Sequence, residues 1–129
     1  MTGTTTDDIG YDTCIEPTTG NIYVTGRVGG TLNGQSYAGG LYDTLLLKYS
    51  SNGTRIWTRI FGSTGDDTGY GVAVDSNTGS VYVTGSAGAA MHGESFLGAW
   101  DIFVSKFSSS GTREWTKMMG SAADDSGLA

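Results

Sequence analysis

Residues 20–26 of the chain read GNIYVTG, and residues 79–85 read GSVYVTG. In both copies Ile or Val alternates with Tyr or Thr between two glycines, which is the pattern of a short β-strand bounded by turns. Because the stretch returns almost unchanged, the chain is built on an internal repeat. The fold class follows from what surrounds the two copies.

Pairs of adjacent aspartates set the length of the repeat. The pairs begin at Asp7, Asp66 and Asp124, which are 59 and then 58 residues apart. The predicted domain organisation is therefore a first repeat with its lead-in at residues 1–65, a second repeat at residues 66–123, and the start of a third at residues 124–129.

Each repeat contains four stretches with the alternation of a short strand. Turns rich in Gly, Asn, Ser and Thr join the first stretch to the second and the third to the fourth, and Gly or Asn supplies the positive φ that a tight hairpin needs. Four sequential antiparallel strands form a meander, and one meander per repeat is a propeller blade. The sequence predicts an all-β fold of two four-stranded antiparallel, propeller-like blades, as a partial propeller or an open repeat array. The expected strands are 10–16, 21–27, 42–49 and 55–61 in the first repeat, and 69–75, 80–86, 100–107 and 113–119 in the second.

The connection between the second and third strands is unusually long, at residues 28–41 and 87–99. Loops of this length in a compact domain are uncommon and disproportionately functional. We therefore expect a partner or glycan surface at these connections and at the start of the strands that follow them, with aromatic rings for stacking. The predicted contact residues are Tyr37, Tyr42, Phe96 and Trp100. On the fourth strands, Trp57 and Trp115 are expected to pack between blades.

The composition excludes several classes of partner. Among 129 residues, 13 are acidic and seven basic, so the net charge of -6 repels a phosphate backbone, and nucleic acid is not expected. The sequence also shows no apolar run of membrane length, so membrane insertion is not expected. A signal peptide is absent as well, but this does not argue for the cytosol.

The aspartate pairs allow two interpretations. Neighbouring residues of an extended chain project to opposite sides, so the two members of a pair cannot act together as an acid and a base on one substrate. The structural interpretation is that one Asp caps the turn into the first strand by accepting bonds from backbone N–H groups. The alternative is a calcium site at Asp7, Asp66 and Asp124, since calcium prefers hard oxygen ligands. No other cofactor is expected.

The chain has one histidine and one cysteine, and neither is repeated in the other copy. His92 is the only histidine and aligns with Asn33, so neither a zinc site nor a Ser-His-Asp arrangement is indicated. Cys14, the only cysteine, aligns with Ala73 and is expected to be a buried structural thiol. We predict that the chain is not an enzyme.

Asn52-Gly53-Thr54 is an N-glycosylation sequon at a predicted hairpin tip, which is an accessible place for a glycan. The second repeat has Ser110 at the same position, so the fold does not require the sequon. Asn52 is therefore either a glycosylation site or a turn residue chosen for its φ.

Taken in order, GNIYVTG at residues 20–26, YDTLLLKY at 42–49, NGTRIWT at 52–58 and FGSTGDD at 61–67 resemble the bacterial SBBP family, the seven-bladed β-propeller repeat. The resemblance covers residues 7–65 and 66–123. It implies a propeller fold in large extracellular or cell-surface proteins, with no catalytic residues to transfer.

Two blades are fewer than the four to eight with which propellers typically close. We therefore expect the partners to include further blades of the same chain or copies of it. The favoured function is a non-catalytic structural or interaction module of an extracellular β-propeller repeat protein. The alternatives are a subunit of a homopolymeric extracellular assembly or fibre formed through blade-edge pairing, and a glycan- or calcium-binding lectin-like propeller.

Overall fold

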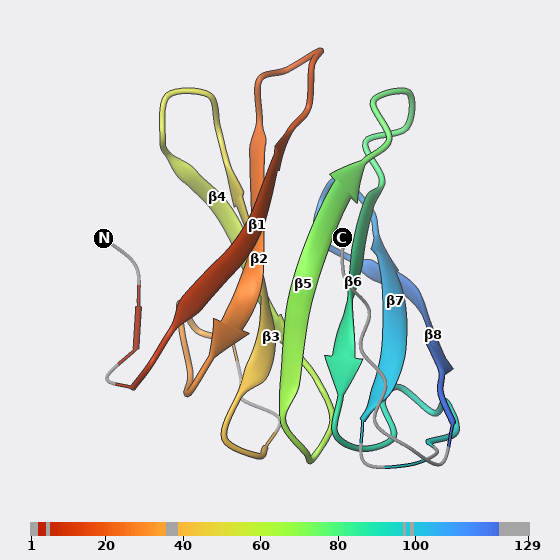
Figure 1. Ribbon diagram of the computed structural model, residues 1–129. Helices are drawn as coiled ribbons and strands as arrows, with labels where there is room; N and C mark the ends of the chain where they lie inside the picture. The colour runs from red at the N-terminus through yellow and green to blue at the C-terminus, as the bar shows by residue number, and fades with distance from the viewer. Residues whose placement is uncertain (1–2, 5, 36–38, 97, 99, 122–129) are drawn as a thin grey trace.

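The computed structural model describes residues 3–4, 6–35, 39–96, 98 and 100–121. The regular structure of these residues consists of two four-stranded antiparallel sheets, each with its strands in sequence order (Figure 1). The all-β class and the two four-stranded blades are thereby confirmed. No helix that could span a membrane occurs among the described residues. The first sheet contains β1 (Ile9–Ile15), β2 (Ile22–Val28), β3 (Asp43–Tyr49) and β4 (Arg55–Phe61), and the second β5 (Asp67–Val74), β6 (Val81–Ala87), β7 (Asp101–Phe107) and β8 (Arg113–Met119).

The hairpins close where glycine adopts a left-handed conformation. Gly20 and Gly79 both have a φ of 75° in the turns after β1 and β5, and Gly53 and Gly111 have φ values of 86° and 88° in the turns before β4 and β8. A residue with a Cβ atom would be strained at these positions. The predicted strand bounds, which depend on this turn chemistry, agree with the observed ones to within about two residues.

Strand pairing assigns the side chains of each sheet to two faces. We call one the tryptophan face, because it carries the tryptophan of the fourth strand, and the opposite one the valine face. The tryptophan face carries Tyr23, Leu46, Trp57 and Phe61 in the first sheet, and the equivalent Tyr82, Val104, Trp115 and Met119 in the second. The valine face carries Val24, Leu45, Leu47 and Ile60 in the first sheet, and Val83, Phe103, Ser105 and Met118 in the second.

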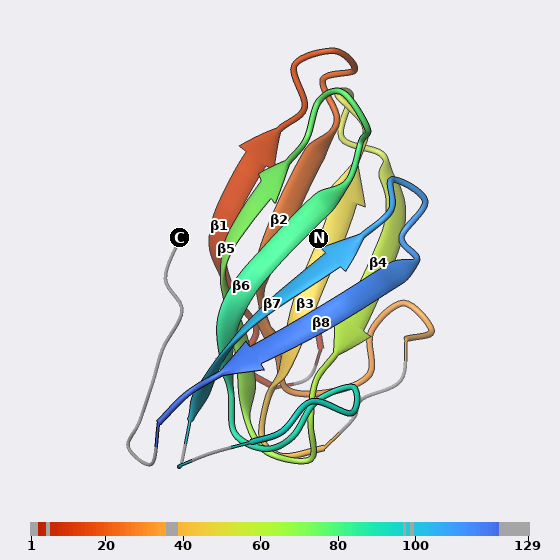
Figure 2. The ribbon, with the colours of Figure 1, turned by 90° about the vertical axis from the view of Figure 1, so that its right-hand side faces the viewer.

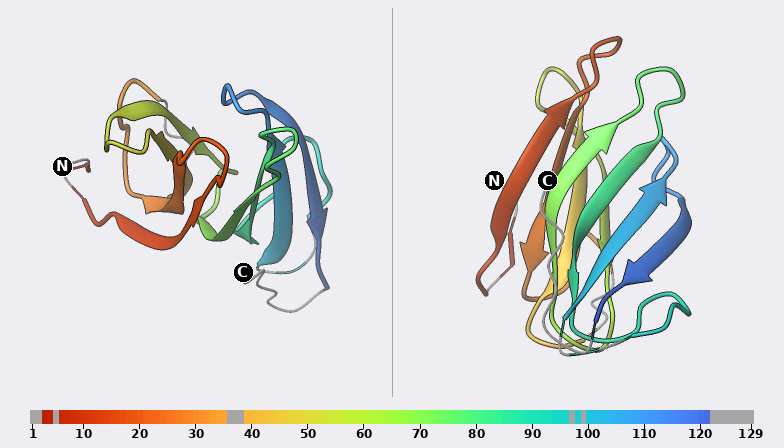
Figure 3. Two further views of the ribbon diagram at one scale, coloured as in Figure 1. Left: turned by 90° about the horizontal axis from the view of Figure 1, so that it is seen from above. Right: turned by 45° about the vertical axis from the view of Figure 1, so that its right-hand side comes forward.

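The tryptophan face of the first sheet packs against the valine face of the second. The second sheet lies in front of the first in Figure 2, and the two sheets form separate layers when seen from above (Figure 3); β5 lies against the first sheet. The second sheet thus covers the tryptophan face of β3, and Leu32 packs on its valine face, so residues 43–48 are all buried. The cluster that joins the sheets contains Tyr23, Leu46, Trp57 and Phe61 from the first, and Val72, Val81, Val83, Phe103 and Phe107 from the second.

The long connections partly serve the core. Leu32 is buried in a cluster with Leu45 and Ile60 on the valine face of the first sheet, and Met91, its equivalent, is buried in the cluster between the sheets. These apolar side chains fold back onto the sheets because burial removes their surface from water. Leu32 and Met91 are therefore not available to a partner.

Candidate functional site

A cleft of about 380 Å³ opens where β3 and β7 begin, and both repeats contribute to its walls. Its size lies at the lower end of the range for small-ligand pockets. The lining combines aromatic rings with charged and hydroxyl groups. It includes Arg27, Tyr42, Asp66, Thr68, Tyr70 and Trp100.

Backbone bonds hold the first wall of the cleft in place. The N–H of Asp67 donates to the carbonyl oxygen of Tyr42 at 2.9 Å, which joins the start of β5 to the residue before β3. The N–H of Leu41 donates to the carboxylate of Asp66. These two bonds fix Tyr42 beside Asp66, although the residues come from different sheets.

Arg27 fixes the ring of Tyr42. Its guanidinium lies 4.0 Å from the centre of that ring, which is a cation–π contact. The Nε atom of Arg27 is buried without a hydrogen-bond partner among the described residues. The guanidinium of Arg27 therefore holds the Tyr42 ring in position within the cleft.

The structure brings together two of the four predicted contact residues. Tyr42 and Trp100 both line the cleft. Phe96 is half-buried and is not among the described residues that line it, and Tyr37 lies outside the described residues.

Asp66 also lines this cleft, whereas Asp7 lines an adjacent one of about 440 Å³ that shares Tyr42. The described residues contain no group of three or more His, Cys, Asp or Glu side chains placed to hold a metal ion. Asp124 lies outside the described residues. Calcium at Asp7, Asp66 and Asp124 thus stays a prediction.

The second aspartate of each of the two described pairs accepts backbone bonds, as the capping interpretation predicts. Asp67 accepts from the N–H of Ser63 at 2.7 Å and from that of Gly88 at 3.3 Å. Asp8 accepts the equivalent bond from the N–H of Gly29 at 3.3 Å. In both repeats the carboxylate ties the strand entry to the end of the second strand.

Burial changes the acidity of this cap. The side chain of Asp67 is fully buried, and burial raises the pKa of its carboxyl to about 6. The nearby charge of Asp43 raises the pKa further, while the bonds from Ser63 and Gly88 lower it. The folded protein thus binds a proton at Asp67 more tightly than the unfolded chain, whose value is near 3.8.

Asp67→Asn should change how stability depends on pH. As the pH rises from about 4 to about 6, the unfolded chain loses the Asp67 proton before the folded protein does, so the contribution of Asp67 to wild-type stability falls over this window. The substitution removes this contribution and leaves every other titrating group in place. The melting temperature of wild type should therefore fall relative to that of Asp67→Asn as the pH rises through the window. Two parallel profiles would contradict the assignment.

Asn52 lies at the exposed tip of the hairpin between β3 and β4. Its side-chain oxygen accepts from the N–H of Thr54 at 3.3 Å and from the hydroxyl of Ser50. The residue thus supports the turn and is also accessible, so glycosylation at Asn52 stays a prediction.

The other reactive side chains are placed as structural groups. Cys14 is half-buried against the cluster between the sheets, and burial, together with the charge of Asp12, raises the pKa of its thiol to about 11. His92 stacks on Phe61 with ring centres 6.1 Å apart. Burial, reinforced by the positive charge of Arg113, lowers the pKa of His92 to about 4, so the ring is neutral at pH 7.

A set of polar contacts between the blades has no signal in the sequence. Trp57 Nε1 donates to the carbonyl oxygen of Ser109 at 3.0 Å, and Lys48 Nζ donates to the same oxygen at 2.8 Å. Arg59 Nε donates to the carbonyl oxygen of Gly111 at 2.6 Å. These side chains reach the turn between β7 and β8 only after the two sheets have packed, so spacing along the chain could not reveal them.

Comparison with known families gives one match. Residues 56–90 match the SBBP family, described as a beta-propeller repeat, which confirms the resemblance to that family. The matched segment runs from β4 through β5 and β6, so it bridges the two sheets. No curated protein matches the chain significantly.

Proposed function

We propose, from the match of residues 56–90 to a β-propeller repeat, that the chain is a non-catalytic structural and interaction module of an extracellular repeat protein. Its sheets form the scaffold, and the cleft at the start of β3 and β7 contacts the partner. The observation that carries this proposal is that the cleft gathers Tyr42, Asp66 and Trp100 from three separate segments.

A rigid scaffold is supported by the continuous packing between the sheets. The wall around Tyr42 is fixed by a backbone bond and by Arg27, so little ordering is needed when a ligand binds. Asp67 has a pKa in the range of a general acid, but its side chain is fully buried and bonded to Ser63. A substrate cannot reach it, which favours binding over catalysis.

A carbohydrate is the ligand whose chemistry suits the cleft best. Sugar rings present apolar C–H faces that pack on aromatic side chains, and Tyr42 and Trp100 supply such rings. Asp66 and the hydroxyls of Thr68 and Ser86 can hydrogen-bond to sugar hydroxyls. An extracellular module would meet such ligands on cell surfaces.

Replacing Trp100 or Tyr42 with alanine should weaken glycan binding strongly. A glycan array probed with wild type should give signals that both variants lose by about tenfold or more, since each removes an aromatic contact worth about 1.4 kcal/mol or more. Trp115→Ala is the matched control, because it removes a tryptophan outside the cleft. An array without wild-type signals, or signals that Trp115→Ala loses equally, would refute the carbohydrate proposal.

The same array tests calcium. If Asp7 or Asp66 holds a calcium ion that contributes to ligand binding, a chelator should reduce the wild-type signals. Equal signals with and without the chelator would exclude calcium from the binding site.

A further inference from the structure

The contact between the two blades centres on a group of side chains that we call the turn clamp. In the first sheet it consists of Tyr23, Lys48, Trp57 and Arg59. The last three donate to the carbonyl oxygens of Ser109 and Gly111, as described above. Tyr23 supports them, with its ring 6.1 Å from that of Trp57 and 5.4 Å from Lys48 Nζ. The clamp thus holds the turn between the third and fourth strands of the next blade.

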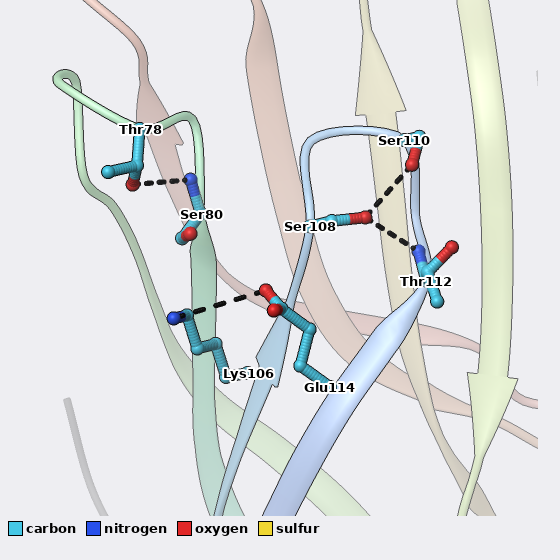
Figure 4. Close-up of polar contacts among 7 residues, drawn as sticks. All are labelled: Thr78, Ser80, Lys106, Ser108, Ser110, Thr112 and Glu114. Atoms are coloured by element: carbon cyan, nitrogen blue, oxygen red, sulfur yellow. Dashed lines mark hydrogen bonds and ion pairs between the residues drawn. The ribbon is translucent and has the colours of Figure 1, made fainter.

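The second sheet carries the same clamp in nearly the same geometry. Its members are Tyr82, Lys106, Trp115 and Lys117. The rings of Tyr82 and Trp115 are 6.3 Å apart at 57°, compared with 6.1 Å at 55° in the first sheet. Lys106 Nζ is 5.9 Å from the Tyr82 ring and forms a 3.9 Å ion pair with Glu114 beside it (Figure 4).

This second clamp faces solvent. Trp57 is 8% exposed but Trp115 is 36% exposed, and Phe61 is 7% exposed but its equivalent Met119 is 74% exposed. An apolar hollow of about 280 Å³ lies on the same face, with Tyr82 and Val104 in its lining. Equivalent side chains thus differ in burial because another blade covers only the first set.

The opposite side of the molecule presents the complementary surface. On the valine face of the first sheet, Ile15 is 62% exposed, whereas its equivalent Val74 packs into the cluster between the sheets. The exposed turn at residues 51–53 is equivalent to the turn at residues 109–111 that the first clamp holds. The chain therefore carries both halves of the blade-to-blade contact, one at each end.

We infer that the tryptophan face of the second sheet is a docking surface for the valine face of the first sheet in a second copy of this chain. Trp115 and Lys106 donate to the Ser51 carbonyl of that copy, and Lys117 donates to the Gly53 carbonyl. This site lies outside the cleft, so the inference goes beyond the proposed function. It also differs from blade-edge pairing, because the blades meet by their faces. The contact is head-to-tail, so a docked pair leaves one surface of each kind available to further copies.

The mass of the chain in solution, measured by sedimentation against concentration, tests this inference. The protein is made in a host that does not glycosylate, because a glycan at Asn52 would block the docked turn. Wild type should associate as its concentration rises. Met119→Glu on one surface and Ile15→Glu on the other should each weaken association by about tenfold or more, since each places an unpaired charge in the contact. Leu41→Glu, at an exposed apolar residue that lines the cleft beside Asp7 and belongs to neither the clamp nor the turn at residues 51–53, is the control and should associate like wild type.

Mixing Met119→Glu with Ile15→Glu tests whether the contact is head-to-tail. Met119→Glu retains an intact valine face and Ile15→Glu an intact clamp, so the equimolar mixture should form a heterodimer and nothing larger. Lys117→Arg places an arginine where the first clamp has Arg59. It should strengthen the association of the otherwise wild-type protein about tenfold, because a guanidinium can form two hydrogen bonds to the docked turn at once. All variants are first checked for an unchanged circular dichroism spectrum.

Three results would overturn the inference. They are a wild type that stays monomeric at every concentration, a mixture of the two variants that stays monomeric, and association that Met119→Glu does not weaken.

Discussion

Trp57→Ala should lower the free energy of unfolding by about 3–5 kcal/mol, whereas Trp115→Ala should lower it by only about 1 kcal/mol. The two tryptophans are equivalent in the repeat. Trp57 lies in the cluster between the sheets and donates to the Ser109 carbonyl, so its removal leaves a cavity and removes one of the two hydrogen bonds to that oxygen, which keeps its bond from Lys48. Trp115 is partly exposed on the outer face, and water can replace most of its contacts.

Urea denaturation at low protein concentration measures both variants against wild type. Low concentration matters because association would add to the apparent stability of wild type but not of Trp115→Ala. Similar losses for the two variants would show that the sheets do not pack as described. A reversed order would show that the first tryptophan face is the open one.

Gly85→Ala should destabilise the protein by about 3 kcal/mol or more, because no space exists for the added methyl group. An ideal Cβ atom at this position would lie 1.9 Å from the carbonyl oxygen of Thr68 and 2.9 Å from the ring of Phe103. The Thr68 oxygen belongs to the backbone of β5, which cannot rotate away. Gly26 meets the same obstacle at the Ile9 carbonyl oxygen, also at 1.9 Å. The closing glycine of the GNIYVTG motif is thus required by the close approach of the first strand.

Gly10→Ala is the matched control for this substitution. Its added Cβ atom would lie 3.6 Å from Val24, which is an ordinary contact, so stability should change by less than about 0.5 kcal/mol. Thermal and urea unfolding of the three proteins check the prediction. A Gly85→Ala variant as stable as wild type would show that the Thr68 carbonyl of β5 does not lie this close to Gly85 of β6.

The strands were predictable because their signals are local. Alternation around residues 20–26 and 79–85 defines β2 and β6, and the turn glycines at Gly53 and Gly111 define where β4 and β8 begin. Both signals act within a few residues and do not depend on how the sheets pack. The repeat then supplied a second, independent copy of each.

The difference in burial between the tryptophan faces of the two sheets could not be predicted from the sequence. Trp57 and Trp115 have nearly the same sequence neighbours, so only the order of the blades in space decides which is covered. Both were predicted to pack between blades, and within the described part of the chain only Trp57 does. Trp115 is left for a surface that another blade would provide.

Only part of the candidate site could be predicted, because some of its residues come together only when the sheets pack. Tyr42 and Trp100 stood out as aromatic residues after long connections, and the cleft contains both. Arg27 and Tyr70 gave no signal, because they lie inside strands and reach the cleft only through packing. Leu32 and Met91 were placed in a predicted contact loop, although the apolar surface of both draws them into the core.

The number of sheets per chain restricts any ring made only of copies of this chain. The described residues of each copy form two blades, so a ring of two, three or four such copies would contain four, six or eight blades, within the range of typical propellers. An odd total, including the seven blades of the family that the sequence resembles, is excluded for such a ring by parity. Counting blades in an assembled particle would therefore tell whether the docked surfaces belong to identical chains or to chains of different length.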